Sequence, residues 1–534
     1  MGKTSATGSF RLLIGVAVST IIMAIGSIVL GNLLSQDEYG LYGIVVVPSA
    51  LIILFRDWGV NSAMTKYIAS LRAAHREDEI HDYVVAGLIF EVASGIALSF
   101  LSLLLASFIA SFYHKPESAS YIAIVSVSIV AGSLLAASQA GFVGYERMGL
   151  NSLTLIAQAV AKTLVGPALV FIGYSVLGAI IGYVLGFVVA GIIGLTIFYL
   201  ALLRPLRKNR TKKSNLIKTL KIMLHYGVPL SIGSMLAGVL GQIYAFTIIP
   251  LTTNAMYGNY LIAANFAVLL TFFTIPINTV LFPAFAKLDP DNESELLKNV
   301  FASSVKYASI IVIPAATVLM VLSGPMIGTL FGGKYVYAPL FLTLSVAGAM
   351  FAVIGNLSAG GFLSGVGETK TLMILNIITI VVGIPLGLML IPTLSAWSPT
   401  LGIIGYIIAS VFAGVPSMLW GLYWIWKHYK AKADFASSAK ILAASAIAAV
   451  LAYLPTVFLN AADWIKLVIG LIIFLAAYIF GAPMIGAVSL TDINNLRTMF
   501  SSMSIISKII NIPLKAAEKA AQTKSANRKA GEKP

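Results

Sequence analysis

This chain of 534 residues contains no cysteine and few charged residues. The absence of cysteine excludes disulfides, thiolate metal sites and cysteine nucleophiles. Only 10% of the residues are charged whereas 59% are hydrophobic, and a water-soluble fold of that composition would expose too much apolar surface. Apolar runs of about 20 residues, enough to cross roughly 30 Å of hydrocarbon, recur along most of the chain. The sequence therefore predicts an all-α polytopic membrane protein.

The apolar runs, with the charged or Gly-, Pro- and Asn-rich breaks between them, predict about fourteen transmembrane helices. The shortest break is at Gly173 and Tyr174, between the fifth and sixth expected helices. The expected helices lie near residues 11–34, 41–55, 84–110, 121–143, 152–173, 176–203, 225–250, 258–282, 303–323, 338–362, 371–391, 401–426, 440–459 and 465–488.

The basic residues predict the orientation of the chain, because cytoplasmic loops concentrate Lys and Arg. With the N-terminus inside, 31 of the 35 basic residues fall in cytoplasmic segments, Lys115, Lys334 and Lys466 fall outside, and Lys162 lies within a helix. A miscounted helix would destroy this asymmetry, so both termini are predicted to be cytoplasmic. The net charge of +15 is then a topology signal. A nucleic-acid partner is not expected, because it would need a basic face on a soluble domain.

A Tyr-Gly-x-Tyr motif occurs twice at one offset, in residues 39–42 (YGLY, the first motif) and 257–260 (YGNY, the second motif). Each copy starts the second helix of its half, and the first helices of both halves run in the same direction. The sequence thus predicts a parallel repeat of two six-helix lobes, related by an axis along the membrane normal. Ser35 and Glu38, before the first motif, have the spacing of a helix capping box.

The repeat divides the chain into five expected parts. They are an N-terminal six-helix lobe (1–203), a basic cytoplasmic linker (204–224), a C-terminal six-helix lobe (225–426), two additional transmembrane helices (427–490) and a basic cytoplasmic tail (491–534). Within the tail, residues from about 493 to 514 fit an interfacial amphipathic helix. Residues 515–534 are small, polar and basic enough to be disordered.

Four segments, in order within residues 10–426, carry a family resemblance. Residues 33–69 contain a short acidic E-[FY]-G-x-Y loop followed by the pattern D-x-G-x-x-x-A-x-x-[RK]-x-I-A. The other segments are residues 139–152 (QAGFVGYERMGLNS), 226–244 (YGVPLSIGSMLAGVLGQIY) and 362–392 (FLSGVGETKTLMILNIITIVVGIPLGLMLIP). Together they resemble the polysaccharide-biosynthesis flippases, the lipid-linked oligosaccharide branch of the MOP exporter superfamily.

The resemblance implies a fold and a function. The fold would be two six-helix lobes in a V around a central cavity, often with two extra C-terminal helices. The function would be to flip a polyprenyl-diphosphate-linked sugar across the cell membrane by alternating access, for cell-surface polysaccharide or glycoprotein biosynthesis. Such a protein is not an enzyme and needs no cofactor. Its partners would be membrane lipid and the lipid-linked sugar, while H⁺ or Na⁺ coupling and the oligomeric state stay open.

Lys162 is the leading candidate for substrate binding. It lies about ten residues, or roughly 15 Å, into the fifth expected helix, beyond easy reach of the headgroups. Thr154, Gln158 and Lys162 recur at intervals of four residues, which places them on one helix face. We expect this face to line the cavity and Lys162 to meet the diphosphate. The alternative is that Lys162 belongs to a buried structural ion pair.

Two further charged candidates lie near the cytoplasmic side. Glu91 is the single carboxylate expected well inside a helix, where it would pair with Lys162, take up a coupling proton, or reach the headgroups. Arg56, at the inner end of the second expected helix, could bind a diphosphate bidentately, or form a loop ion pair with its neighbour Asp57.

The remaining candidates are less specific. Lys66 occupies the basic position of the family pattern, and Arg11 is either a substrate contact or an interface anchor. Gln242 is a candidate from the second lobe, on a polar stripe that serves either helix packing or ligand binding. That stripe consists of Ser231, Ser234, Gly238 and Gln242.

Two other functions compete with flipping. A cation-coupled drug or metabolite antiporter of the same superfamily is expected to carry acidic residues inside the first and seventh helices, and this sequence has none there. A membrane sugar ligase or polymerase would need carboxylates or histidines that converge outside the membrane, whereas those of the expected outer loops are scattered.

Overall fold

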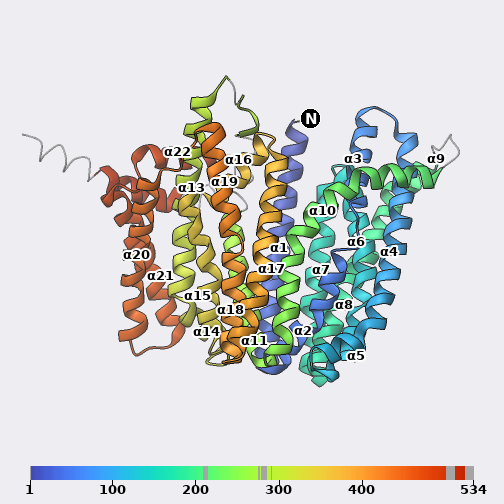
Figure 1. The fold of residues 1–534 in the computed structure, drawn as a ribbon, viewed down its shortest axis with the longest axis horizontal. Helices are drawn as coiled ribbons and strands as arrows, with labels where there is room; N and C mark the ends of the chain where they lie inside the picture. The colour runs from blue at the N-terminus through green and yellow to red at the C-terminus, as the bar shows by residue number, and fades with distance from the viewer. Residues whose placement is uncertain are drawn as a thin grey trace, which may run out of the picture. The chain divides into compact units, whose positions relative to one another are not determined.

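The computed structural model describes residues 2–208, 215–274, 277, 285–289, 292–500 and 511–522, with side chains except at 2–11, 207–208 and 499–500. The secondary structure of these residues is helical, and no strand occurs among them. A helix satisfies its own backbone hydrogen bonds, which is what a segment in hydrocarbon requires. The structure thus confirms the predicted all-α architecture of a multi-pass membrane protein (Figure 1).

The chain folds as two compact units. The first contains Met1–Ile262 and Gly387–Tyr406, and the second contains Ala263–Leu386 and Ile407–Pro534. The helices before the first boundary are α1 (Gly2–Leu33), α2 (Gln36–Ile53), α3 (Val60–Ala73), α4 (Glu77–Phe112), α5 (Ala119–Val125), α6 (Val127–Gly144), α7 (Met148–Leu169), α8 (Ser175–Phe198), α9 (Arg204–Lys208) and α10 (Leu216–Ile248). The helices that cross a boundary are α11 (Asn254–Ala267), α17 (Thr369–Ser395) and α18 (Pro399–Phe412). The second unit also contains α13 (Ser294–Val321), α14 (Ser323–Phe331), α15 (Ala338–Ala347), α16 (Asn356–Gly365), α19 (Val415–Tyr429), α20 (Phe435–Phe458), α21 (Asp463–Ile485) and α22 (Leu490–Phe500).

Eleven helical segments of the described chain are long and apolar enough to span a membrane, or twelve when the bent pair Ala338–Ile354 and Asn356–Gly365 counts as one span. One of the eleven, Met148–Leu206, has 59 residues. At 1.5 Å per residue it would be about 90 Å long if straight, roughly three times the hydrocarbon thickness. The segment must therefore bend, and the predicted number of fourteen helices stays a prediction.

The bend lies at the predicted break, because Gly173 has the non-helical values φ 108° and ψ 6°. After it, α8 returns antiparallel along α7, so that Gly182 faces Gly166 and Gly186 faces Lys162. A Cβ atom on Gly182 would collide with the backbone N and Cα of Gly166. Such close contact between small residues is a main source of helix association in membranes, where burial of apolar surface gives little driving force.

The start of α2 confirms the predicted capping box. The Ser35 hydroxyl oxygen accepts a hydrogen bond from the backbone N–H of Glu38 at 3.2 Å, and Oε2 of Glu38 accepts one from the N–H of Ser35 at 2.7 Å. The acids of this stretch also lie at the positive end of the helix dipole. Their local role is therefore to begin α2.

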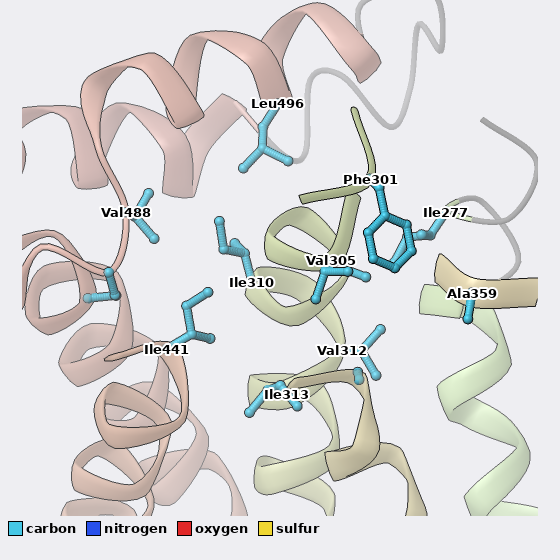
Figure 2. Close-up of a cluster of buried hydrophobic side chains, with 14 of the residues drawn as sticks. Ile277, Phe301, Val305, Ile310, Val312, Ile313, Ala359, Ile441, Val488 and Leu496 are labelled. Carbon is cyan, nitrogen blue, oxygen red and sulfur yellow. The ribbon is translucent and has the colours of Figure 1, made fainter. Parts of the chain in front are cut away.

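In the second unit, α13 supplies the centre of an apolar core. Figure 2 shows Val305 and Ile313 of α13 in a cluster with Ile441 of α20 and Leu496 of α22. An ion pair of 2.6 Å between Lys306 and Asp492 reinforces the contact between α13 and α22. Helix α22 is thus docked on this unit.

The structure corrects one prediction for the tail, because residues 515–522, which belong to the segment predicted to be disordered, are helical and continue a helix that is described from residue 511. Leu514 and Ala517 are buried in the core of the second unit, and Arg497 of α22 pairs with Glu518 at 2.8 Å. The segment KAAEKAAQ (515–522) is rich in alanine, the best helix former, and this propensity outweighs its polar composition. The expected disorder of residues 523–534 falls outside the described residues.

We expect Gly182→Ala to lower the thermal midpoint of the detergent-solubilised protein by several degrees. The added methyl group would force α7 and α8 apart, and overpacking of this kind costs roughly 1–3 kcal/mol. The matched control is Gly481→Ala in α21, where a Cβ atom meets nothing within 4 Å. An equal midpoint for both variants in a fluorescence-monitored melt would contradict the close contact.

Candidate functional site

The two Tyr-Gly-x-Tyr motifs lie in contact within the first unit. Helices α2 and α11 approach at Gly40 and Gly258, where a Cβ atom on Gly40 would collide with the carbonyl group of Asn254. A Cβ atom on Gly258 would lie 2.5 Å from the carbonyl oxygen of Gln36. Glycine is thus needed in both motifs for one reason, which is the close approach of the two helix backbones.

Two polar contacts join the same helix ends. The Asp37 carboxylate accepts a hydrogen bond from the backbone N–H of Ala255 at 3.1 Å, and the side-chain oxygen of Gln36 accepts one from the Asn259 amide at 3.0 Å. Asp37 and Ala255 are separated by 218 residues, the offset of the repeat. Equivalent ends of the two halves therefore meet each other.

The tyrosines of the two motifs have matching environments. The rings of the two tyrosines are 6.1 Å apart in the first motif and 5.8 Å apart in the second. Tyr42 meets Tyr183 of α8 edge to face at 6.4 Å, and Tyr260 meets Tyr406 of α18 edge to face at 4.9 Å. Each motif thus connects the second helix of its predicted half to a tyrosine on the sixth expected helix of the same half.

Lys162 lies beside this tyrosine arrangement. Its Nζ atom is 4.8 Å from the ring centroid of Tyr183, within the range of a cation–π contact. A Cβ atom on Gly186 would lie 3.0 Å from the Cβ atom of Lys162, so glycine lets α8 pass close to the lysine. Among the described residues Lys162 has no carboxylate partner, so the alternative of a structural ion pair is not the arrangement that the structure shows.

Arg56 and Glu91 form an ion pair instead. Nε of Arg56 lies 3.3 Å from Oε2 of Glu91, and Glu91 is fully buried. Asn61 of α3 donates a hydrogen bond of 2.8 Å to the other carboxylate oxygen, while its backbone N–H bonds to Asp57. The structure therefore joins Glu91 to Arg56 rather than to Lys162, and it pairs Arg56 with α4 rather than with the neighbouring Asp57.

Aromatic rings connect the two cations. The ring of Phe187 lies 5.3 Å from that of Tyr183, one turn away on α8. A Cβ atom on Gly132 of α6 would lie 3.2 Å from Nη1 of Arg56 and 3.5 Å from Cδ1 of Phe187. We refer to Lys162, Tyr183, Phe187 and Arg56 as the cation–aromatic cluster. It places two of the predicted cations along one face of α8, with hydrophobic rings between them.

Only part of the predicted polar face of α7 is accessible to a ligand. Thr154 is fully buried, and its hydroxyl oxygen accepts a hydrogen bond from the Gln139 amide at 3.3 Å, so it contacts α6. Gln158 and Lys162, one and two turns further on, are half-buried. Ligand contact from this face is therefore left to Gln158 and Lys162.

The other predicted residues lie outside the cluster. Lys66 is exposed on α3, with its Nζ atom 3.7 Å from the ring centroid of Tyr226 on α10. Gln242 is half-buried on α10. Arg11 lies where no side chain is described, so its predicted role stays a prediction.

Sequence reasoning overlooked Tyr183, Phe187 and the glycine face of α8. The signal was present, because small residues recur at every fourth position and such spacing indicates a close helix–helix contact. These residues are Gly178, Gly182, Gly186, Ala190 and Gly194. The stripe marks the face of α8 that packs on another helix, and the structure shows that this helix is α7.

Comparison with known proteins identifies the family of this chain. A family model described as polysaccharide biosynthesis protein matches residues 5–289, more than half of the chain. The chain belongs to this family. This is the family that the sequence resemblance predicts, the polysaccharide-biosynthesis flippases of the MOP superfamily.

One relative in sequence and two solved structures are similar to this chain over most of its length. An uncharacterized membrane protein of Methanocaldococcus jannaschii is 23% identical over 494 residues, which cover 90% of this chain and 93% of that protein. The lipid II flippase MurJ in an inward closed conformation is similar in structure, with a TM-score of 0.69, 17% identity and coverage of 88% of this chain and 98% of MurJ. An inward-facing multidrug transporter of the MATE family has a TM-score of 0.62, 15% identity and coverage of 79% and 99%. At these identities the two structures establish the family's fold and not its substrate.

The ion pair gives a double-mutant prediction. We expect Glu91→Leu alone to lower the thermal midpoint strongly, because it leaves the buried Arg56 charge unpaired at a cost of about 3–5 kcal/mol. The double variant Arg56→Met/Glu91→Leu should recover most of that loss, since no buried charge remains. Thermal melts of the wild type, Arg56→Met, Glu91→Leu and the double variant measure the coupling free energy between the two residues. Additive effects of the two substitutions would contradict the pairing.

Proposed function

We propose that this protein flips a polyprenyl-diphosphate-linked oligosaccharide from the cytoplasmic to the outer leaflet of the cell membrane, by alternating access and without covalent chemistry. The observation that carries this proposal is Lys162, a cation in a membrane-spanning helix without a carboxylate partner among the described residues. Membership of a polysaccharide biosynthesis family supports an anionic, sugar-bearing substrate.

The energetics of Lys162 favour an anionic ligand. Placing an ammonium group deep in a bilayer costs several kcal/mol, and a desolvated cation–π contact returns about 2 kcal/mol of that cost. A diphosphate would supply the missing counter-charge. Gln158, one turn away, adds a side-chain amide for sugar or phosphate oxygens.

Arg56 and Glu91 receive a different role in the proposal. Because Glu91 neutralises Arg56, the arginine is a weaker site for an anion while the pair persists. Protonation of Glu91, or Na⁺ binding to it, would release Arg56 toward the substrate and couple transport to an ion. Lys66 and Arg11 then serve as entry contacts at the cytoplasmic side, and Gln242 as a polar contact from the second half.

The proposed topology has fourteen helices with both termini in the cytoplasm. The eleven apolar segments become twelve when Met148–Leu206 is counted as a hairpin of two helices. The bent pair adds one helix, and α2, which begins with two acidic residues, adds another, so that the total is fourteen. The lobes would be residues 1–203 and 225–426, joined by the linker 204–224 and followed by the helices of 427–490 and the tail 491–534. The matching motif environments support this division.

In this topology the contact between the two motifs lies at the outer face. Alternating access requires the outer ends of the two halves to separate when the substrate leaves toward that side. The contact at Gly40 and Gly258 is held by two hydrogen bonds and by van der Waals packing, without an ion pair between the two helices among the described residues. Such a contact can open without exposing a buried charge.

A second candidate function is cation-coupled export of a drug or metabolite. The similarity in fold to a MATE multidrug transporter favours it, and so does the membrane carboxylate Glu91. It differs from the first proposal in its substrate, which would be a small molecule without a lipid tail.

The first test is flipping by the full chain reconstituted in liposomes with a fluorescent polyprenyl-diphosphate oligosaccharide. We expect the wild type to exchange the lipid between leaflets faster than empty liposomes, and Lys162→Ala to lose most of this activity. The matched control, Lys440→Ala, removes an exposed lysine of α20 and should leave the rate unchanged.

The possible results distinguish the flippase function, the role of Lys162 and the antiporter function. Exchange by the wild type no faster than in empty liposomes would reject the flippase proposal, whereas normal exchange by Lys162→Ala would reject only the role of Lys162. Release of an entrapped cationic dye, driven by an ion gradient and without lipid exchange, would favour the antiporter.

A second test uses the absence of cysteine in the native chain. In the variant Asp37→Cys/Ala255→Cys we expect oxidation to stop exchange and reductant to restore it, because a disulfide would hold the outer contact shut. The two single cysteine variants are the controls for oxidation alone. Full exchange by a protein that gel mobility shows to be cross-linked would refute opening at this contact.

A further inference from the structure

A cavity of about 400 Å³ lies in the second unit, where α19 ends and α20 begins. Its wall is apolar and aromatic, with Phe301 of α13 and Leu422 and Trp426 of α19 among the residues that form it. Phe435, the first residue of α20, lines it as well and is 56% exposed. A cavity of this volume accommodates part of a hydrocarbon chain, and apolar walls favour that occupant over water.

Three lysines lie close to the aromatic rings that line this cavity. Lys432 lines it directly, and its Nζ atom is 5.8 Å from the ring centroid of Trp426. The Nζ atom of Lys430 is 5.5 Å from the same ring, and Lys427 lies 6.0 Å from the ring of Tyr423. Ammonium groups held near one indole repel each other, and an anion placed among them removes that repulsion.

Asp434, the acidic residue between α19 and α20, interacts with the start of α20 and not with these lysines. Asp434 caps α20, and its carboxylate accepts a hydrogen bond from the backbone N–H of Ser437 at 3.0 Å. Hydrogen bonds from the side chain and the backbone of Ser437 lower the pKa of Asp434 below its usual value. Asp434 therefore stays ionised for its capping role, and Lys430 and Lys432 have no ion pair with it among the described contacts.

We propose that this cavity binds an anionic phospholipid of the surrounding membrane, with an acyl chain against Phe301 and Leu422 and the phosphate between Lys430 and Lys432. Exposed aromatic rings such as Tyr423 and Trp426 are typical of the depth at which headgroups meet hydrocarbon. Basic pockets between transmembrane helices are suited to phosphate-bearing headgroups at that depth. The site lies in the second unit, whereas the cation–aromatic cluster lies in the first, and the inference does not depend on the transported substrate.

The test is native mass spectrometry of the detergent-solubilised full chain titrated with phosphatidylglycerol or with phosphatidylcholine. We expect the wild type to bind at least one phosphatidylglycerol more tightly than phosphatidylcholine. Lys430→Gln/Lys432→Gln should weaken phosphatidylglycerol binding by about fivefold to thirtyfold, since one cation near an anionic surface contributes about fivefold. Binding of phosphatidylcholine should not change.

Two further variants separate headgroup from chain. The matched control Lys218→Gln/Lys221→Gln removes two exposed lysines of α10 and should bind phosphatidylglycerol as the wild type does. Ala433→Phe adds a ring at a residue that lines the cavity and should weaken binding although every lysine remains. Gel filtration and circular dichroism establish that each variant is folded, and the lysine variants alone suffice should Ala433→Phe not fold.

Several results would overturn the proposal. These are equal affinity of the wild type for both phospholipids, and unchanged phosphatidylglycerol binding by the Lys430/Lys432 variant. Displacement of the phospholipid by glycerol phosphate at a similar concentration would show an anion site without a lipid chain. Displacement by an equal concentration of a polyprenyl diphosphate would instead assign the cavity to the transported lipid.

Discussion

The structure depends on close contact between helix backbones at positions without a side chain. Lipid tails solvate a leucine face as well as another helix does, so apolar burial alone cannot hold membrane helices together. Glycines on α8 bring it against α7, and one glycine in each motif brings α2 and α11 together. The residues of both candidate roles, substrate binding and opening of the outer contact, are positioned by these contacts.

The second constraint is the cost of charge in hydrocarbon. The structure meets it in two ways. Arg56 is neutralised by a buried carboxylate, whereas Lys162 has, among the residues that the structure describes, only the face of Tyr183. A fully paired charge stabilises an arrangement, but it leaves little for a ligand to gain. An incompletely compensated charge favours binding of a mobile anion, which is the property that a transporter of diphosphates requires.

The duplicated motif makes contacts within each predicted half and also joins its two copies to each other. In each copy a tyrosine packs the second helix of that predicted half against the sixth helix of the same half, with the two rings edge to face. Its glycines then join the two copies to each other. In the topology that we propose, each half would keep its internal aromatic contacts while the glycine contact opens and closes.

The sequence by itself determined the class of the protein, its family, the capping box before α2 and the break at Gly173. These follow from composition, spacing and local backbone preferences, which act over a few residues. Only the tertiary structure decided that Glu91 pairs with Arg56, that Thr154 contacts α6, and that the tail helix at 511–522 packs on the second unit. Those results depend on which helix faces meet, and helical periodicity says which residues share a face but not which neighbour that face contacts. Tyr183 illustrates the difference, because nothing within α8 indicates that its ring would lie beside a lysine of α7.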